Sequence, residues 1–236
     1  MLHSKGQVNR AGQLLVDHVH AAAAGKRRVG QQRSELTKAI ETIDWWRGEH
    51  AQPLSRVAAN LRYYASDEGE PVVAQRLKKL PTIVGKLLRT PGMKLARMED
   101  IGGVRAVLPN QDAAYRVAGR LRKNWTITRL RDYVDDPKAD GYRALHLVNR
   151  NRGRLIEVQL RTPLQDTWAN AVEADSRLFA AGLKFGSGPP QLVDFYAALA
   201  ELCAQADQGG PFDPALFAHV KDLETRADTF KRESTR

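Results

Sequence analysis

The sequence predicts one mixed α/β domain, with a sheet of about five strands flanked by helices and accessory helices at both ends of the chain. Three observations support this prediction. The 236 residues fit one domain with appendages, and an apolar content of 42% supplies a core. The spacing of apolar residues changes from a helical period of about 3.6 to a strand period of 2 after Asp100. Helical spacing returns from residue 163 onward.

The first part of the chain reads as helical. Apolar spacing predicts helices over 5–24, 33–48 and 54–65, and Ser34 is the expected N-cap of the second. Pro71 fits the first turn of a further helix, so the chain is expected to stay helical up to residue 99.

The middle of the chain carries the sheet, and the end is helical again. One helix, 111–123, separates the first two strands. We expect an N-terminal helical region over 1–70, a core over 71–181 and C-terminal helices over 182–236. The expected strands are 104–108, 125–131, 143–149 and 154–161, and the later helices are 163–181, 190–207 and 213–230.

The distribution of charge favours a protein that binds phosphates, and the composition argues against a membrane protein. The net charge is +10, and residues 76–161 hold 20 Lys and Arg against 8 Asp and Glu, so the basic excess lies in the centre. Such a concentration favours a surface that meets phosphates, although a solvated basic face would look the same. No stretch is apolar enough for a membrane span or a secretory signal, which favours the cytoplasm. The single cysteine, Cys203, cannot form an internal disulfide.

The segment RLIEVQLR at 154–161 is informative because side chains alternate along a strand. Glu157, Gln159 and Arg161 share the face opposite the apolar residues. Asp100, just ahead of the first strand, is a second acid that could join Glu157 in holding one Mg²⁺, since this ion takes carboxylates together with substrate phosphates. Alternatively, the polar face with Glu157 could simply be the solvated side of a strand, and Asp100 could be a turn residue.

Two basic pairs precede the sheet. Arg76 and Lys79, and then Lys86 and Arg89, are each three residues apart, so on helices each pair would share a face. Together they could clamp a polyphosphate, or they could simply keep the surface soluble.

The loop between the second and third strands carries residues suited to a nucleotide. Tyr133, Lys138, Tyr142 and His146 lie within or just beyond it, and a tyrosine beside a lysine can stack a base and hold its phosphate. Either tyrosine could instead pack beneath the loop. The sequence has no GxxxxGK[ST], GxGxxG or HExxH motif, so any ATP would be bound without a P-loop.

Read in order, four segments resemble the synthetase domain of the RelA/SpoT alarmone family, which has a nucleotidyltransferase-like sheet. They are RLKKLPTIVGK (76–86), EDIGGVRAV (99–107), RDYVDDPKADGYRALHLV (131–148) and IEVQLRTPLQDTWANAVE (156–173). The flanking WWRGEHAQPL (45–54) is similar to the N-terminal part of the stand-alone, single-domain branch.

The resemblance implies a pyrophosphokinase, which uses Mg²⁺ to transfer the β,γ-pyrophosphate of ATP to a ribose 3′-hydroxyl. By position in the motifs, Asp100 and Glu157 would be the catalytic, metal-binding acids. The implied ATP-binding residues are Arg76 and Arg105 on the adenine, with Lys78, Lys86 and Arg89 on the donor side.

The resemblance places Tyr142 against the acceptor's guanine, with Lys138, His146 and Gln159 nearby. Asp166 and Ala174 stand where the family commonly has histidines, which leaves the acceptor open. The expected acceptor is GDP or GTP, giving guanosine tetra- or pentaphosphate. One alternative is the 3′ end of tRNA, in a toxin with a possible antitoxin; another is a non-catalytic nucleotide- or RNA-binding module.

Basic residues outside the nucleotide motifs favour RNA slightly, because a tRNA needs a wide phosphate-binding surface. They are KRR at 26–28 and the group Arg116, Arg120, Arg122 and Lys123, which could equally be a solvent face of one helix. The sequence leaves the oligomeric state open.

Overall fold

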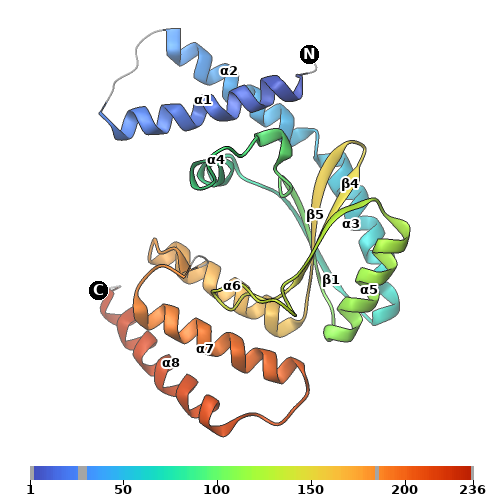
Figure 1. Ribbon diagram of the computed structural model, residues 1–236, viewed down its shortest axis with the longest axis vertical. Helices are drawn as coiled ribbons and strands as arrows, with labels where there is room; N and C mark the ends of the chain where they lie inside the picture. The colour runs from blue at the N-terminus through green and yellow to red at the C-terminus, as the bar shows by residue number, and fades with distance from the viewer. Residues whose placement is uncertain (1–2, 26–30, 184–185, 235–236) are drawn as a thin grey trace.

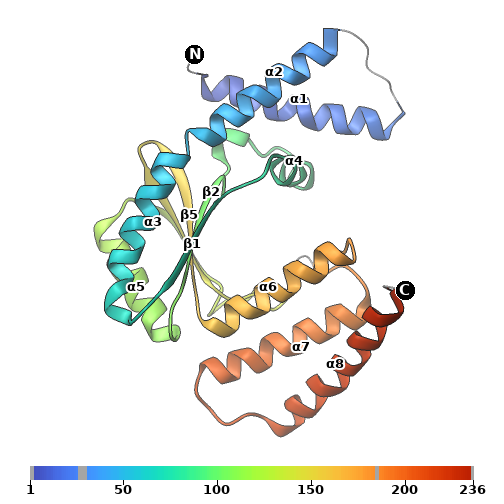
Figure 2. The same ribbon diagram turned by 180° about the vertical axis from the view of Figure 1, so that it is seen from behind.

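The computed structural model describes residues 3–25, 31–183 and 186–234. A central sheet carries two helices on one face, and its other face opens between an N-terminal and a C-terminal group of helices (Figures 1 and 2). The predicted mixed α/β architecture is therefore confirmed. No helix within the described part of the chain is both long and apolar enough to cross a membrane.

The sheet has five strands in the order β1-β2-β5-β4-β3. Strands β2 and β5 are parallel, whereas the pairs β1–β2, β5–β4 and β4–β3 are antiparallel. The strands are β1 Val72–Leu77, β2 Gly102–Val107, β3 Ile127–Asp132, β4 Leu145–Asn151 and β5 Arg154–Arg161.

The first strand corrects the expectation of helix up to residue 99. Residues 72–77 pair along their whole length with β2, and Pro71 precedes a strand and not a helix. The segment VVAQRL is short and carries apolar residues that fit either period, so pairing with β2 decided its conformation. Arg76 therefore lies on a strand, and Lys79 is the N-cap of the following helix, so the two do not share a helical face.

Side-chain caps mark the start of some of the helices. The helix Lys5–Ala23 has a capping box between Ser4 and Gln7, and the helix Pro163–Leu178 has one between Thr162 and Gln165. Ser34, the expected cap of the second helix, lies inside it. The helices are α1 Lys5–Ala23, α2 Gln31–Gly48, α3 Ala51–Ala65, α4 Leu80–Arg89, α5 Gln111–Asn124, α6 Pro163–Leu178, α7 Pro190–Asp207 and α8 Pro214–Ser234, with 3₁₀ turns η1 Ser66–Glu68 and η2 Leu95–Arg97.

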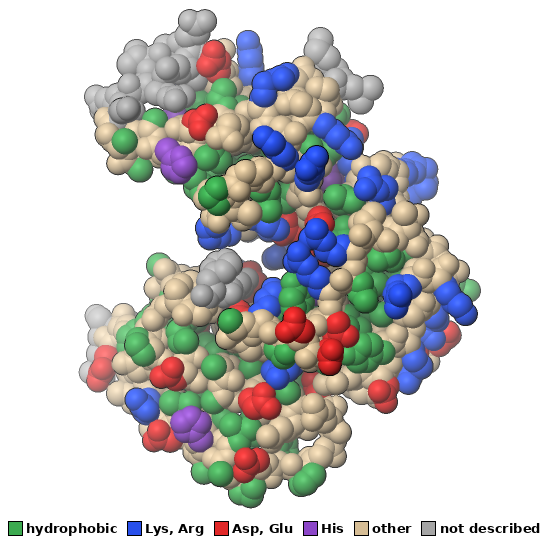
Figure 3. Space-filling view, in the orientation of Figure 1, with side chains coloured by type: hydrophobic (Ala, Val, Ile, Leu, Met, Phe, Trp, Pro, Cys, Tyr) green, Lys and Arg blue, Asp and Glu red, His purple; other side chains and the backbone are tan. Residues whose placement is uncertain are grey.

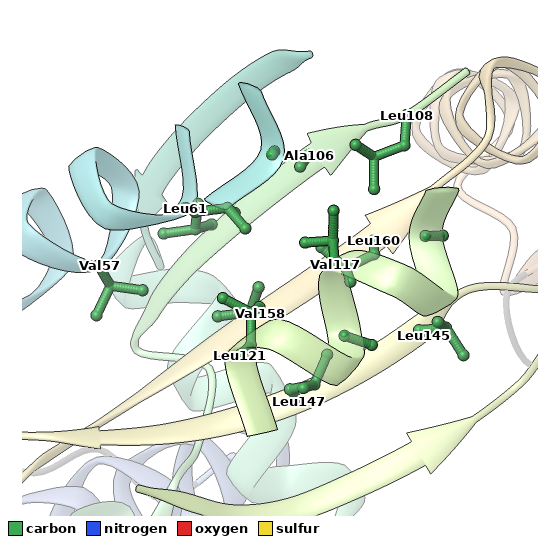
Figure 4. Close-up of a cluster of buried hydrophobic side chains, with 14 of the residues drawn as sticks. Val57, Leu61, Ala106, Leu108, Val117, Leu121, Leu145, Leu147, Val158 and Leu160 are labelled. Carbon is green, nitrogen blue, oxygen red and sulfur yellow. The ribbon is translucent and has the colours of Figure 1, made fainter. Parts of the chain in front are cut away.

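The main core lies between the sheet and the pair α3 and α5 (Figure 4). Leu61, Val117 and Leu121 pack there against Val158 and Leu160. Because alternate side chains point to opposite faces, burying Val158 and Leu160 turns the polar residues of β5 toward the open face.

Two further cores hold the flanking helices. One joins α6, α7 and α8 around Trp168, Leu192 and Tyr196, and the other joins α1, α2 and α4 around Ile43 and Ile83. The open face of the sheet lies between these two helical groups. The division at residues 70 and 181 stays a prediction.

Candidate active site

The candidate active site lies on the open face of the sheet, in a notch with Lys and Arg side chains along its wall (Figure 3). Strand register brings the residues together. Arg105 of β2 is opposite Gln159 of β5, which is in turn opposite His146 of β4. Two residues earlier on β2, Gly103 is opposite Arg76 of β1 on one side and Glu157 of β5 on the other. Residues up to 81 positions apart in the chain (76 and 157) thus meet on one surface.

Asp100 lies just before β2 and binds two lysines. Lys78 Nζ is 2.8 Å from its Oδ2 and Lys86 Nζ is 2.9 Å from its Oδ1. Burial pushes the pKa of Asp100 upward, but the two ammonium groups outweigh it and hold the pKa below its ordinary value. Asp100 is therefore a firmly ionised carboxylate between two cations.

Lys78 is fixed through its backbone. Its amide donates to the carbonyl of Ile101, and its own carbonyl accepts from Arg47 Nε of α2, both at 2.8 Å. The helix α2 thus helps to aim the lysine that binds Asp100.

Glu157 lies at the centre of β5 and is also held ionised. Its Oε1 is 3.2 Å from His146 Nδ1, and its Oε2 accepts from Gln159 Nε2 at 2.7 Å. Burial raises the pKa of Glu157, but the hydrogen bonds and nearby positive charge, including that of Lys86, lower it to about 2.

A chain of hydrogen bonds continues from His146 to Tyr142 and Arg161. The Tyr142 hydroxyl is 2.7 Å from His146 Nε2 and accepts from Arg161 Nη2 at 2.9 Å. Burial lowers the pKa of His146, which favours the neutral ring. A neutral ring satisfies every partner, because its Nδ1–H donates to Glu157 and its Nε2 accepts from the tyrosine.

Arg161 and Asp166 are site residues that the motif-based assignment left out. Arg161 is 7% exposed and donates to Gln159 and, at 3.0 Å, to Asp166 on α6. The same oxygen of Asp166 lies 3.0 Å from Arg105 Nη1, and Asn170 donates to the other oxygen. The signal for Arg161 was its shared strand face with Glu157, whereas no local signal predicted the two arginine partners of Asp166. Ala174, further along α6, is exposed.

The tyrosine expected on the acceptor side, Tyr142, is well packed. Tyr142 is 9% exposed and follows Gly141, whose φ of 86° favours glycine. Lys138 Nζ lies 4.4 Å from the centre of the Tyr142 ring and 4.6 Å from that of Tyr133. Burial lowers the pKa of Lys138. The lysine covers one face of Tyr142, so a base stacking on that face would have to displace it.

The two remaining arginines of the implied ATP site lie at its edge. The side chain of Arg76 is 71% exposed on the edge strand β1, and its Nη1 is 3.8 Å from Glu173. Arg89 is the last residue of α4, one turn beyond Lys86, and is exposed.

Asp100 and Glu157 suit a hard divalent cation because both are held ionised and each has further lone pairs. Within the described ranges no group of three or more His, Cys, Asp or Glu side chains could hold a metal ion. Two carboxylates alone need further oxygens, which substrate phosphates would supply.

The expected RNA-binding group on α5 is partly neutralised. Arg116 donates to Glu68 at 2.7 Å, and Arg120 also binds Glu68, while Arg122 and Lys123 are exposed. Residues 26–28, the other basic segment, lie outside the described residues.

The central region of the chain is similar to known proteins. Residues 75–178 match the family described as "Region found in RelA / SpoT proteins". An uncharacterized protein of Mycobacterium tuberculosis is 31% identical over 150 residues, which are 61% of this chain and 54% of that protein. A probable chloroplastic GTP diphosphokinase of Arabidopsis thaliana, RSH2, is 29% identical over 68% of this chain and 21% of its own length. The chain thus spans about half the length of the mycobacterial relative.

Solved structures show the same fold. The small alarmone synthetase 1 of Bacillus subtilis has a TM-score of 0.61 and 23% identity, with coverage of 70% of this chain and 94% of that one. A GTP pyrophosphokinase family protein of Streptococcus pneumoniae also has a TM-score of 0.61, with 22% identity and coverage of 78% and 96%. These similarities confirm the predicted fold class.

Proposed function

Since residues 75–178 match the region found in RelA/SpoT proteins, we propose that this protein is an ATP-dependent pyrophosphokinase acting on the 3′-hydroxyl of GDP or GTP. The observation that carries the proposal is the pair of ionised carboxylates, Asp100 and Glu157, set among cations on one face of the sheet. A site that only bound phosphates would gain nothing from two carboxylates, which repel phosphates unless a cation intervenes. Relatives named GTP diphosphokinase or GTP pyrophosphokinase support the reaction class.

In this reaction the ribose oxygen forms a bond to the β-phosphorus of ATP, the bond from that phosphorus to the oxygen bridging it to the α-phosphorus breaks, and AMP leaves. The transferred group is highly anionic, so positioning and charge neutralisation should supply most of the rate. Asp100 and Glu157 would hold Mg²⁺, which when bound neutralises the phosphates and orients them.

Glu157 also has a role toward the acceptor. A carboxylate with a pKa of about 2 is a weak base at neutral pH. It therefore accepts the proton late, when bond formation to phosphorus has made the hydroxyl acidic. His146 and Gln159 hold the carboxylate in place for this step through one hydrogen bond to each oxygen.

The donor side of the site is built from basic residues. Lys86 and Arg89, one turn apart on α4, and Lys78 after β1 would bind the ATP phosphates. Arg76 and Arg105 would flank the adenine from neighbouring strands. Binding ATP in this way requires Arg105 to exchange its contact with Asp166 for the base.

The acceptor would bind on the other side, against Tyr142 and Lys138. Lys138, held between two aromatic rings, can move toward an acceptor phosphate and uncover the tyrosine face for a guanine. His146 and Arg161 bind the Tyr142 hydroxyl and so keep the ring oriented, and Gln159 accepts a hydrogen bond from Arg161.

The test is a transfer assay with the full chain, Mg²⁺ and ATP labelled in its β- and γ-phosphates, with GDP, GTP and deacylated tRNA as separate acceptors. We expect label on GDP or GTP. Glu157→Gln should lower turnover at least about 100-fold while nucleotide binding is retained. Glu224→Gln, a change of the same kind on α8 at a half-exposed carboxylate paired with Lys221, is the matched control and should behave like wild type.

Two results would contradict the proposal. Label on tRNA alone would assign the same chemistry to a different acceptor. Absence of transfer to all three acceptors, with Glu157→Gln binding nucleotides as wild type does, would favour the non-catalytic binding module.

A further inference from the structure

A basic cavity lies away from the candidate active site, where the N-terminal helices meet the β4–β5 hairpin. Its volume is about 190 Å³. Four cations from four segments line it: Lys5 at the start of α1, Arg97 in η2, Arg150 on β4 and Arg154 on β5. Residues separated by up to about 150 positions in the chain thus converge on one small space.

The same cavity has an ordered aromatic wall. Trp46 is 3% exposed, and its indole Nε1–H is buried without a hydrogen-bond partner among the described residues. The Arg154 guanidinium lies 4.1 Å from the centre of the Trp46 ring and binds Glu49 at 3.0 Å. His50, which is 1% exposed, completes the wall and binds the Trp46 carbonyl through Nδ1 at 2.8 Å.

The charges of this cavity are not balanced by acids. Lys5, Arg97 and Arg150 make no side-chain hydrogen bond or ion pair with any residue that the structure describes, and only Arg154 has a carboxylate partner. The pair Arg116 and Arg120 on α5 is built differently, since both bind Glu68. Three unpaired positive charges around one cavity repel one another. A bound anion would replace this repulsion by attraction to each cation.

We propose that this cavity is a binding site for a small phosphate anion of the size of phosphate or pyrophosphate. Guanidinium groups suit phosphate oxygens because they donate two hydrogen bonds in parallel, and the lysine adds a point charge. The volume is below that of pockets for drug-sized ligands, which favours a phosphate group over a whole nucleotide. A bound RNA strand would instead need cations spread along a track.

The site is placed to influence the candidate active site. Arg97 is three residues before Asp100, and Arg154 is three residues before Glu157. Arg47, next to Trp46, donates to the carbonyl of Lys78. An anion in the cavity therefore contacts segments that lead directly to both carboxylates.

The experiment is calorimetric titration of the full chain with sodium phosphate and with sodium pyrophosphate, without nucleotide or Mg²⁺. The double variant Arg97→Ala/Arg150→Ala should weaken anion binding at least about tenfold, because each charge-assisted contact contributes roughly that factor or more. Both side chains are exposed, so the variant is expected to fold, which circular dichroism will check.

Two controls distinguish binding in this cavity from binding elsewhere on the protein. Arg152→Ala changes the same charge on the same hairpin, where the arginine binds Gln52 and does not line the cavity, and it should leave binding within about twofold. Lys86→Ala disturbs the candidate active site and should preserve the binding event that the double variant removes.

Three outcomes would overturn the inference. One is loss of the only anion-binding event in Lys86→Ala with retention in the double variant, which would place the anion in the candidate active site. Another is equal weakening by Arg152→Ala, which would indicate a diffuse surface field. The third is binding of a short RNA oligonucleotide, lost in the double variant, by a chain that binds neither phosphate nor pyrophosphate.

Discussion

Lowering the pH from 7 to 5 should destabilise the protein through one buried histidine. His50 is 1% exposed, and burial is the main cause that lowers its pKa from 6.5 to about 4, with Arg154 adding to the effect. The bond to the Trp46 carbonyl and the charge of Glu49 act in the opposite direction but do not outweigh burial. At neutral pH the folded protein therefore holds a neutral ring.

The direction and the size of this change in the free energy of unfolding follow from proton linkage. Below the ordinary pKa the unfolded chain binds a proton at His50 while the folded protein does not, so stability is fully present above about pH 6.5 and is lost as the pH falls toward 4. A pKa difference between 6.5 and about 4 corresponds to about 3 kcal/mol, of which about 2 kcal/mol is lost between pH 7 and pH 5.

Urea denaturation followed by circular dichroism at pH 7 and pH 5 measures this loss. The variant His50→Gln cannot take up the proton, so its free energy of unfolding should fall by about 2 kcal/mol less than that of wild type over the same interval. His219→Gln, an exposed change on α8, should keep the wild-type difference. Equal losses in wild type and His50→Gln would refute the reasoning.

Two further changes test the loop that carries Tyr142. Tyr142→Phe removes the hydroxyl that binds His146 and Arg161 and should lower the free energy of unfolding by about 1–3 kcal/mol in urea titrations; no change would show that those partners find replacements. Gly141→Ala places a Cβ against Ala200 at a φ of 86° and should cost more stability than Gly153→Ala, where φ is 76° but the space is open. The denaturation midpoints of the two variants measure this difference. Equal losses of stability would mean that backbone strain alone matters.

Part of the fold was predictable because its signals are local. The alternation in RLIEVQLR predicted which face of β5 is buried, and the burial of Ile156, Val158 and Leu160 confirms it. The helical periods after residue 163 likewise predicted α6, α7 and α8 to within a few residues. In each case the residue spacing itself carries the information.

The strand β1 was not predictable in this way. Its six residues have too weak a period to exclude a helix, and their hydrogen bonds come from β2, about 30 positions later. Consequently the placement of Arg76 beside Gly103 and Glu157 across the sheet depended on a pairing that no local pattern records.

The sequence by itself determined the fold class, the central basic excess and the motifs that resemble a RelA/SpoT synthetase domain. Only the tertiary structure decided how the charges pair. Asp166 binds Arg105 and Arg161, and Lys78 binds Asp100, because strand register and helix docking bring these groups to within about 3 Å. The physical reason is range, since periodicity reflects neighbours within a few residues, whereas an ion pair requires contact between distant segments.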